Sequence, residues 1–158
     1  MQDRLQDLRG RCKRQDLEFV AEVQTRPSLQ AGFLQVVSQA QQMLTQVHDI
    51  NLQVVKLRED YVKVAMPEKE KEMNAETNVL VTRSRTCLNR VKIILEEMKK
   101  ELEIKESPGA PESRMKENLY STLAKRFEEM LIECDEVQTG FRQKVKDKVR
   151  NQVRMCEC

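Results

Sequence analysis

Residues 36–64 read VVSQAQQMLTQVHDINLQVVKLREDYVKV. Apolar or small side chains recur there in steps of four and three, at Val36, Ala40, Met43, Val47, Ile50, Val54, Leu57, Tyr61 and Val64. Because a helix turns once every ~3.6 residues, this rhythm keeps one narrow face apolar for about eight turns. Such a helix is stable only when that face packs against other helices. The stretch therefore predicts a helical bundle, with its first long helix over residues 28–65.

Two further stretches show the same rhythm. The first, residues 68–105, has its apolar face at Met73, Thr77, Leu80, Ser84, Cys87, Val91, Ile94, Met98 and Leu102, with Val79, Leu88 and Leu95 widening it. The second, residues 113–153, has its face at Leu119, Leu123, Phe127, Met130, Cys134, Val137, Phe141, Val145, Val149 and Val153. Gly140 interrupts it at a cost of ~1 kcal/mol relative to alanine, but the continuing pattern predicts that the helix passes through.

Helix-breaking residues separate the three stretches. Ser28 is the expected N-cap of the first helix, and Met66-Pro67 ends that helix. The Ser107–Pro111 segment is the clearest loop, and Ser113 is the expected cap of the third helix. Since short connections force neighbouring helices to run antiparallel, the sequence predicts an all-α, antiparallel up-down-up three-helix bundle.

The bundle is expected to occupy residues 28–155. Residues 1–27 are mostly polar and are predicted to form a flexible N-terminal arm, and residues 156–158 form a divergent cysteine-containing tail. Charged residues make up 34% of the chain and aromatic residues 4%, which suits long helices packed along a seam better than an enzyme core. The sequence shows no apolar run of the ~20 residues that a membrane-spanning helix needs. The five cysteines include no CxxC pair, so we expect reduced thiols and a cytosolic chain as given.

Residues for catalysis or metal binding are not apparent. His48 is the single histidine, and we expect it at the polar edge of the seam. No Ser/His/Asp set, glycine-rich phosphate loop or metal-ligand spacing accompanies it. We therefore expect no enzyme activity, no cofactor and no metal. Nucleic-acid binding is disfavoured because two tyrosines and four phenylalanines offer few platforms for stacking on bases.

Basic residues gather near the C-terminus although the net charge is only +2. They are Arg142, Lys144, Lys146, Lys148, Arg150 and Arg154, against Asp147 and Glu157. One interpretation is that these cations stabilise the end of the third helix through its dipole, by ~0.3–1 kcal/mol each. The other is that, beside Cys156 and Cys158, they form a lipidation site that attaches the chain to a membrane.

Three stretches resemble the N-terminal three-helix (Habc) domain of syntaxins, the target-membrane SNARE proteins, and the likeness is strongest to the plasma-membrane type. They are MQDRLQDL (residues 1–8), SRMKENLYSTLAKRFEEML (Ser113 to Leu131) and FRQKVKDKVRNQVRM (Phe141 to Met155). The family normally continues into a linker, a SNARE motif and a membrane anchor. This sequence ends before them, so we expect a truncated product or an isoform, whose full-length relatives are membrane-anchored.

The resemblance implies two contact surfaces and no catalysis. In the family, the N-terminal peptide docks on SM-type (Sec/Munc-type) regulators, which implies contacts from Asp3, Arg4, Leu5 and Leu8. The family's own SNARE helix lies in the groove between the second and third helices, so this chain is expected to act in trans on other SNARE proteins. Thr77 and Ser84 then either belong to a partly polar groove or merely face solvent.

The implied function is that of a regulatory domain in vesicle docking, membrane fusion and intracellular trafficking. An alternative from another class is a structural helical bundle that self-associates through its seam and has no SNARE role. Concentration-dependent oligomers without SM-protein binding would be its signature.

Overall fold

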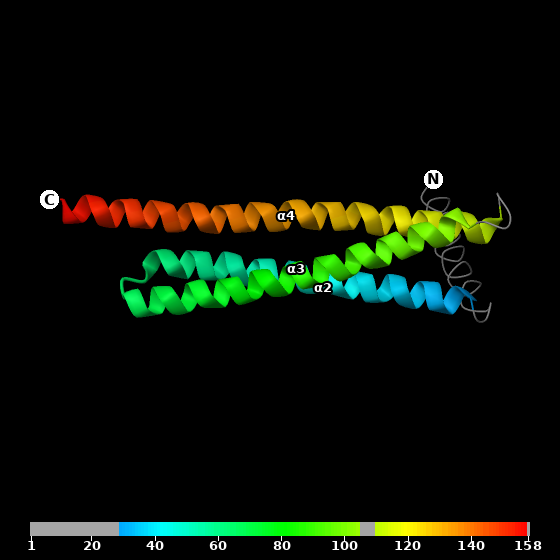
Figure 1. Cartoon of the computed structure of the whole chain (residues 1–158), viewed down its shortest axis with the longest axis horizontal. Coiled ribbons are helices and arrows are strands. Elements are labelled where there is room, and N and C mark those ends of the chain that lie inside the picture. Colours follow the sequence, from blue (N-terminus) through cyan, green and yellow to red (C-terminus); the bar gives the residue numbers. More distant parts are fainter. Residues whose placement is uncertain (1–28, 105–109, 158) are drawn as a thin grey trace, which may run out of the picture. The chain divides into compact units, whose positions relative to one another are not determined.

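A computed structural model describes residues 29–104 and 110–157 of the chain. The chain consists of two compact units, residues 1–38 and residues 39–158. In the first unit the structure describes residues 29–38, which begin the first helix. The described residues form three helices and no strand: α2 (Leu29–Lys63), α3 (Pro67–Glu103) and α4 (Pro111–Cys156). Within residues 39–158 each helix runs antiparallel to the next (Figure 1), so the predicted all-α, up-down-up bundle is confirmed.

Proline begins both α3 and α4. Met66 precedes α3 in an extended conformation (φ −91°, ψ 121°), and Ala110 precedes α4 in the same way (φ −62°, ψ 140°). A residue before proline avoids helical angles, whereas proline itself suits the first helical position, where its missing N–H has no partner to lose. The expectation that Ser113 caps the last helix is wrong, because Pro111 starts α4 earlier and places Ser113 inside the first turn.

The apolar face of α2 is wider than a two-stranded seam. Ala40, Val47, Ile50, Val54 and Tyr61 are buried as the rhythm predicts. Met43 and Leu57 are only half-buried, and the neighbouring Leu44 is fully buried instead. A helix that packs on two partners buries this third row beside the heptad positions, which explains the shift.

The inner face of α3 is partly polar. Thr77 and Ser84 are both buried, so the interpretation that they face solvent is wrong. Thr77 satisfies its hydroxyl locally by donating to the Met73 carbonyl at 2.8 Å. Val79 was expected to widen the apolar stripe but is 67% exposed, because it lies on the far side of α3 from its neighbours.

Helix α4 is continuous through Gly140 and reaches Cys156, three residues beyond the predicted end. Cys156 is therefore its last helical residue rather than the start of a separate tail. The apolar stripe, however, stops being buried before the helix stops. Val149 and Val153 are each 51% exposed, since the last turns of α4 extend beyond the connection between α2 and α3 (Figure 1).

Candidate functional site

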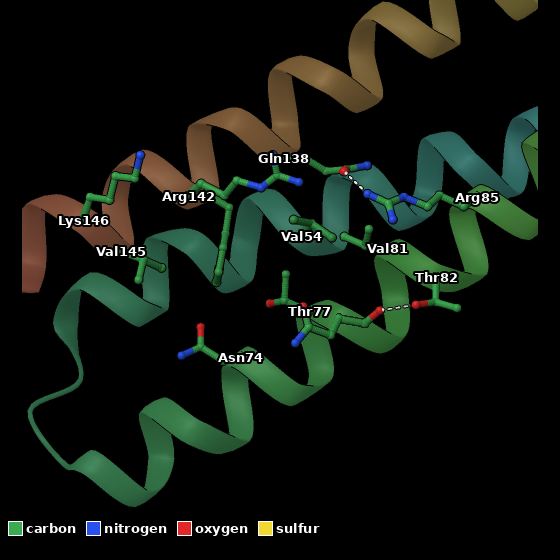
Figure 2. Close-up of a pocket in the computed structure, with 12 residues that line it drawn as sticks. Val54, Asn74, Thr77, Val81, Thr82, Arg85, Gln138, Arg142, Val145 and Lys146 are labelled. Carbon is green, nitrogen blue, oxygen red and sulfur yellow. Dashed lines mark hydrogen bonds between the residues drawn. The ribbon is translucent and has the colours of Figure 1, made fainter.

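A cavity of about 640 Å³ lies in the groove between α3 and α4 (Figure 2). Its walls come from one face of each helix, with one side chain reaching it from α2. The lining residues are Val54, Asn74, Thr77, Asn78, Val81, Thr82, Arg85, Gln138, Phe141, Arg142, Val145 and Lys146. The lining residues span positions 74–85 of α3 and 138–146 of α4, about three and about two and a half helical turns, which suits an elongated partner rather than a small ligand.

The floor of the groove is apolar. Val54 and Phe141 are buried there and belong to a core cluster with Ile50, against which the half-buried Val145 packs. Val81 contributes a further half-buried methyl surface from α3. Half-buried aliphatic side chains in a groove leave apolar area that a docking helix can cover.

The rim of the groove is polar and basic. Arg85 projects from α3, while Arg142 and Lys146 project from α4, and none of the twelve side chains lining this cavity is acidic. Arg85 donates from Nη2 to Gln138 Oε1 at 3.3 Å, the bridge across the groove drawn in Figure 2. Three cations around an apolar floor favour a partner with an apolar stripe flanked by carboxylates.

Hydrogen bonds from two side chains of α4 reach across to the α2 side of the bundle. Arg126 donates to Thr45 Oγ1 at 3.3 Å, near the middle of α2. Lys148 donates to the backbone carbonyls of Tyr61, at 2.7 Å, and of Val64, at the C-terminal end of α2 and just after it. The α3–α4 side is also bridged, through Arg85 and Gln138, but the groove beside that contact stays accessible.

A buried polar layer crosses the middle of the bundle. Asn51 of α2, 4% exposed, donates from Nδ2 to Glu133 Oε1 at 3.1 Å and lies 3.4 Å from Cys134 Sγ. Ser84 of α3 approaches the same sulfur at 3.5 Å. His48 Nδ1 lies 2.9 Å from the same Glu133 oxygen. Hydrogen-bonded polar groups inside a bundle penalise any helix shift that would unpair them, so this layer fixes the register of the three helices.

This layer was only partly anticipated. His48 was expected at the edge of the seam, and it lies there on the exposed side of Glu133. The sequence pattern did not identify the roles of Asn51 and Glu133. Asn51 follows the heptad residue Ile50, in the same row of α2 as the buried Leu44, so a wider apolar stripe on α2 would have predicted its burial. Its position in the third row of α2 was the available signal.

The side chain of Arg58 reaches Gly140 from α2. A Cβ atom at position 140 would lie 2.5 Å from Arg58 Nη1. A larger residue there would therefore require this guanidinium group, the flexible end of the side chain, to shift.

The predicted site residues fall mostly outside the described part of the chain. Asp3, Arg4, Leu5, Leu8 and Cys158 all lie outside it. Cys156 is described, and it is an exposed free thiol at the end of α4. Within residues 29–104 and 110–157, no group of three His, Cys, Asp or Glu side chains is arranged to hold a metal ion. The helices described are also too polar for any of them to cross a membrane.

Comparison with known proteins gives two findings. Residues 30–157 match the family model described as Syntaxin. Among solved structures, the chain is similar to one in the "Crystal structure of the Unc18-syntaxin 1 complex from Monosiga brevicollis", with a TM-score of 0.72 and 20% sequence identity. The match covers 91% of this chain and 68% of that one, and at this identity it establishes the likeness of fold.

Proposed function

This chain belongs to the syntaxin family, and from that premise we propose that it is a non-catalytic regulatory domain in vesicle docking and membrane fusion. In the proposal it binds SNARE motifs in trans through the α3–α4 groove and engages an SM-type regulator. In the proposal it acts at the plasma membrane, because its first residues resemble those of plasma-membrane syntaxins.

The observation that carries the proposal is the open groove between α3 and α4. It combines an apolar floor with a basic rim, and the half-buried Val81 and Val145 line it beside the hydrogen bond from Arg85 to Gln138. A SNARE motif is an amphipathic helical segment, and a helix-in-groove contact of this kind is recognised through apolar side chains at i, i+3, i+4 and i+7. Carboxylates flanking that stripe would meet Arg85, Arg142 and Lys146.

Two valines of α3 give a matched test of groove binding. Val81 lines the groove and Val79 is exposed on another face of the same helix. We expect Val81→Asp to weaken binding of a fluorescently labelled SNARE-motif peptide at least tenfold, because the new carboxylate replaces apolar contact area. Val79→Asp introduces the same charge and should leave binding within twofold.

Fluorescence anisotropy measures both affinities, and thermal melts confirm that both variants remain folded. Equal loss of affinity in the two variants would mean that the groove is not the binding surface. No binding of the unaltered chain to any SNARE-motif peptide would remove the groove proposal altogether.

SM-protein binding through the N-terminal peptide is a separate part of the proposal. Support comes from the sequence likeness of residues 1–8 and from the fold match to a chain of a complex whose title pairs syntaxin 1 with Unc18. Arg4 would be the polar anchor, Leu5 and Leu8 the apolar anchors, and Asp3 a supporting contact. A peptide of residues 1–20 titrated onto an SM protein should lose most of its affinity with Arg4→Ala. Indistinguishable binding of the two peptides would contradict it.

Lipidation of Cys156 and Cys158 completes the proposal. The exposure of the Cys156 thiol supports it, as does the basic residue Arg154 nearby. Two acyl chains give stable anchoring where one gives only marginal attachment. We expect the chain to be attached to membranes in cells. Hydroxylamine should release it, and Cys156→Ser combined with Cys158→Ser should abolish the attachment. Attachment that persists after hydroxylamine treatment would contradict thioester lipidation.

A further inference from the structure

We propose that the C-terminal end of α4 binds the surface of an anionic phospholipid bilayer directly, without covalent modification. Lys148 is the last residue of α4 that makes a hydrogen bond or ion pair to residues outside that helix, which are Tyr61, Val64 and Glu70. Every residue from 149 to 157 is exposed. About two turns of helix therefore present all their side chains to the surroundings.

An aliphatic stripe runs along these turns. Val149, Val153 and Cys156 follow one another at steps of four and three, which places them on one face of a helix. The two valines are each 51% exposed, and Met155, on another face of these turns, is 81% exposed. These side chains give the exposed turns of α4 a small apolar strip.

Cations outnumber carboxylates around this stripe. Arg150 and Arg154 lie between and after its valines, Lys144 and Lys146 precede it on α4, and all four are exposed. The carboxylates are Asp147, which accepts a hydrogen bond from Gln143 at 3.0 Å, and the exposed Glu157. An aliphatic face beside clustered Lys and Arg is the pattern of helices that lie in the interface of anionic membranes.

The charges determine the strength of this binding. Each Lys or Arg near an anionic bilayer strengthens binding about fivefold, so three such cations contribute about a hundredfold. The two valines are small side chains and add less. Since exposed charges are screened by salt over a Debye length of about 8 Å at physiological ionic strength, the binding should be reversible and salt-sensitive. The stripe carries no aromatic ring for stacking on bases, which disfavours single-stranded nucleic acid. Duplex DNA offers phosphates to the cations but no apolar layer to the valines, so the combination favours a lipid surface.

The test is co-sedimentation of the full chain, made in bacteria so that its cysteines are unmodified, with large unilamellar vesicles. One set of vesicles contains phosphatidylcholine alone, and the other contains phosphatidylcholine mixed with phosphatidylserine. The variant Lys144→Glu/Arg150→Glu/Arg154→Glu removes the proposed surface and spares the groove. Arg83→Glu/Arg90→Glu/Lys125→Glu makes the same change in net charge at exposed positions elsewhere on α3 and α4.

We expect binding to the phosphatidylserine vesicles only, weakened at least fiftyfold by the α4-end variant and no more than about fivefold by the control variant. Raising the salt concentration should release the bound chain. Three results would overturn the proposal: no binding to either vesicle, equal binding to both, or equal losses in the two variants. Displacement of the chain from vesicles by duplex DNA at equal phosphate concentration would also overturn it, in favour of a nucleic-acid surface. None of these outcomes bears on SNARE-motif binding, which the groove variants test separately.

Discussion

The end of α2 and the start of α3 are held to α4 by one lysine, which makes Lys148→Met the most informative stability test. Lys148 Nζ lies 2.7 Å from Glu70 Oε1 and donates to the carbonyl of Tyr61 at 2.7 Å and to that of Val64. It also lies 4.4 Å from the centre of the Tyr61 ring. One ammonium group thus makes an ion pair, caps a helix end and contacts an aromatic face.

The expected cost follows from the burial of the pair. The side chains of Lys148 and Glu70 are 14% and 17% exposed. Removing one partner of a buried ion pair costs about 3–5 kcal/mol, because the other charge remains buried without compensation. Since both side chains here retain some contact with water, we expect the lower end, about 3 kcal/mol in the free energy of unfolding. Replacing the stranded carboxylate as well, with Glu70→Gln, should recover about 1 kcal/mol.

Urea unfolding followed by far-ultraviolet circular dichroism measures these differences. Lys144→Met is the matched control, because Lys144 is an exposed lysine one turn earlier on the same helix, and its change should stay within about 0.5 kcal/mol. A loss below about 1 kcal/mol for Lys148→Met would refute the reasoning. So would a double variant less stable than Lys148→Met alone.

Three further predictions concern other contacts of the bundle. Asn51→Ala should lower the free energy of unfolding by about 2 kcal/mol, because it removes the α2 side chain of the buried polar layer. A loss below about 0.5 kcal/mol in urea unfolding would contradict this role of Asn51. Gly140→Ala should leave the stability of the unaltered chain nearly the same, because the gain in helix propensity offsets the contact with Arg58. In an Arg58→Ala background it should stabilise the chain by about 1 kcal/mol. Equal effects in both backgrounds would contradict the close approach. Val149→Ser and Val153→Ser should each change stability by less than about 0.5 kcal/mol, and a loss above about 1 kcal/mol by thermal melting would mean that these valines are covered.

The number, order and direction of the helices were predictable because they depend on local signals. The apolar rhythm marked each helix, and Pro67 marked the boundary between the first two. The boundary error at Ser113 has a local cause too, since a proline two residues earlier is a stronger start signal than a serine. The third helix resembles that of syntaxins, and the match of residues 30–157 to the Syntaxin family model confirms this family.

The packing side of each residue was less predictable. A stripe gives the direction of burial but not which neighbour covers it, so Val79, Val149 and Val153 were placed in the core and are exposed. Ser84 was placed on the packing face with a solvent-facing alternative left open, and it touches Cys134 in the core. Contacts between helices such as Arg58 with Gly140 depend on three-dimensional register, which no single stretch of sequence records.

In the proposed function, the α3–α4 groove receives an amphipathic SNARE-motif helix. Nuclear magnetic resonance of the isotope-labelled chain, titrated with an unlabelled SNARE-motif peptide, tests this most directly. We expect the backbone amide shifts to change mainly along the groove, above all at Thr77, Val81, Arg85, Gln138 and Val145. Changes confined to the α2–α4 seam, or no changes at saturating peptide, would contradict groove binding.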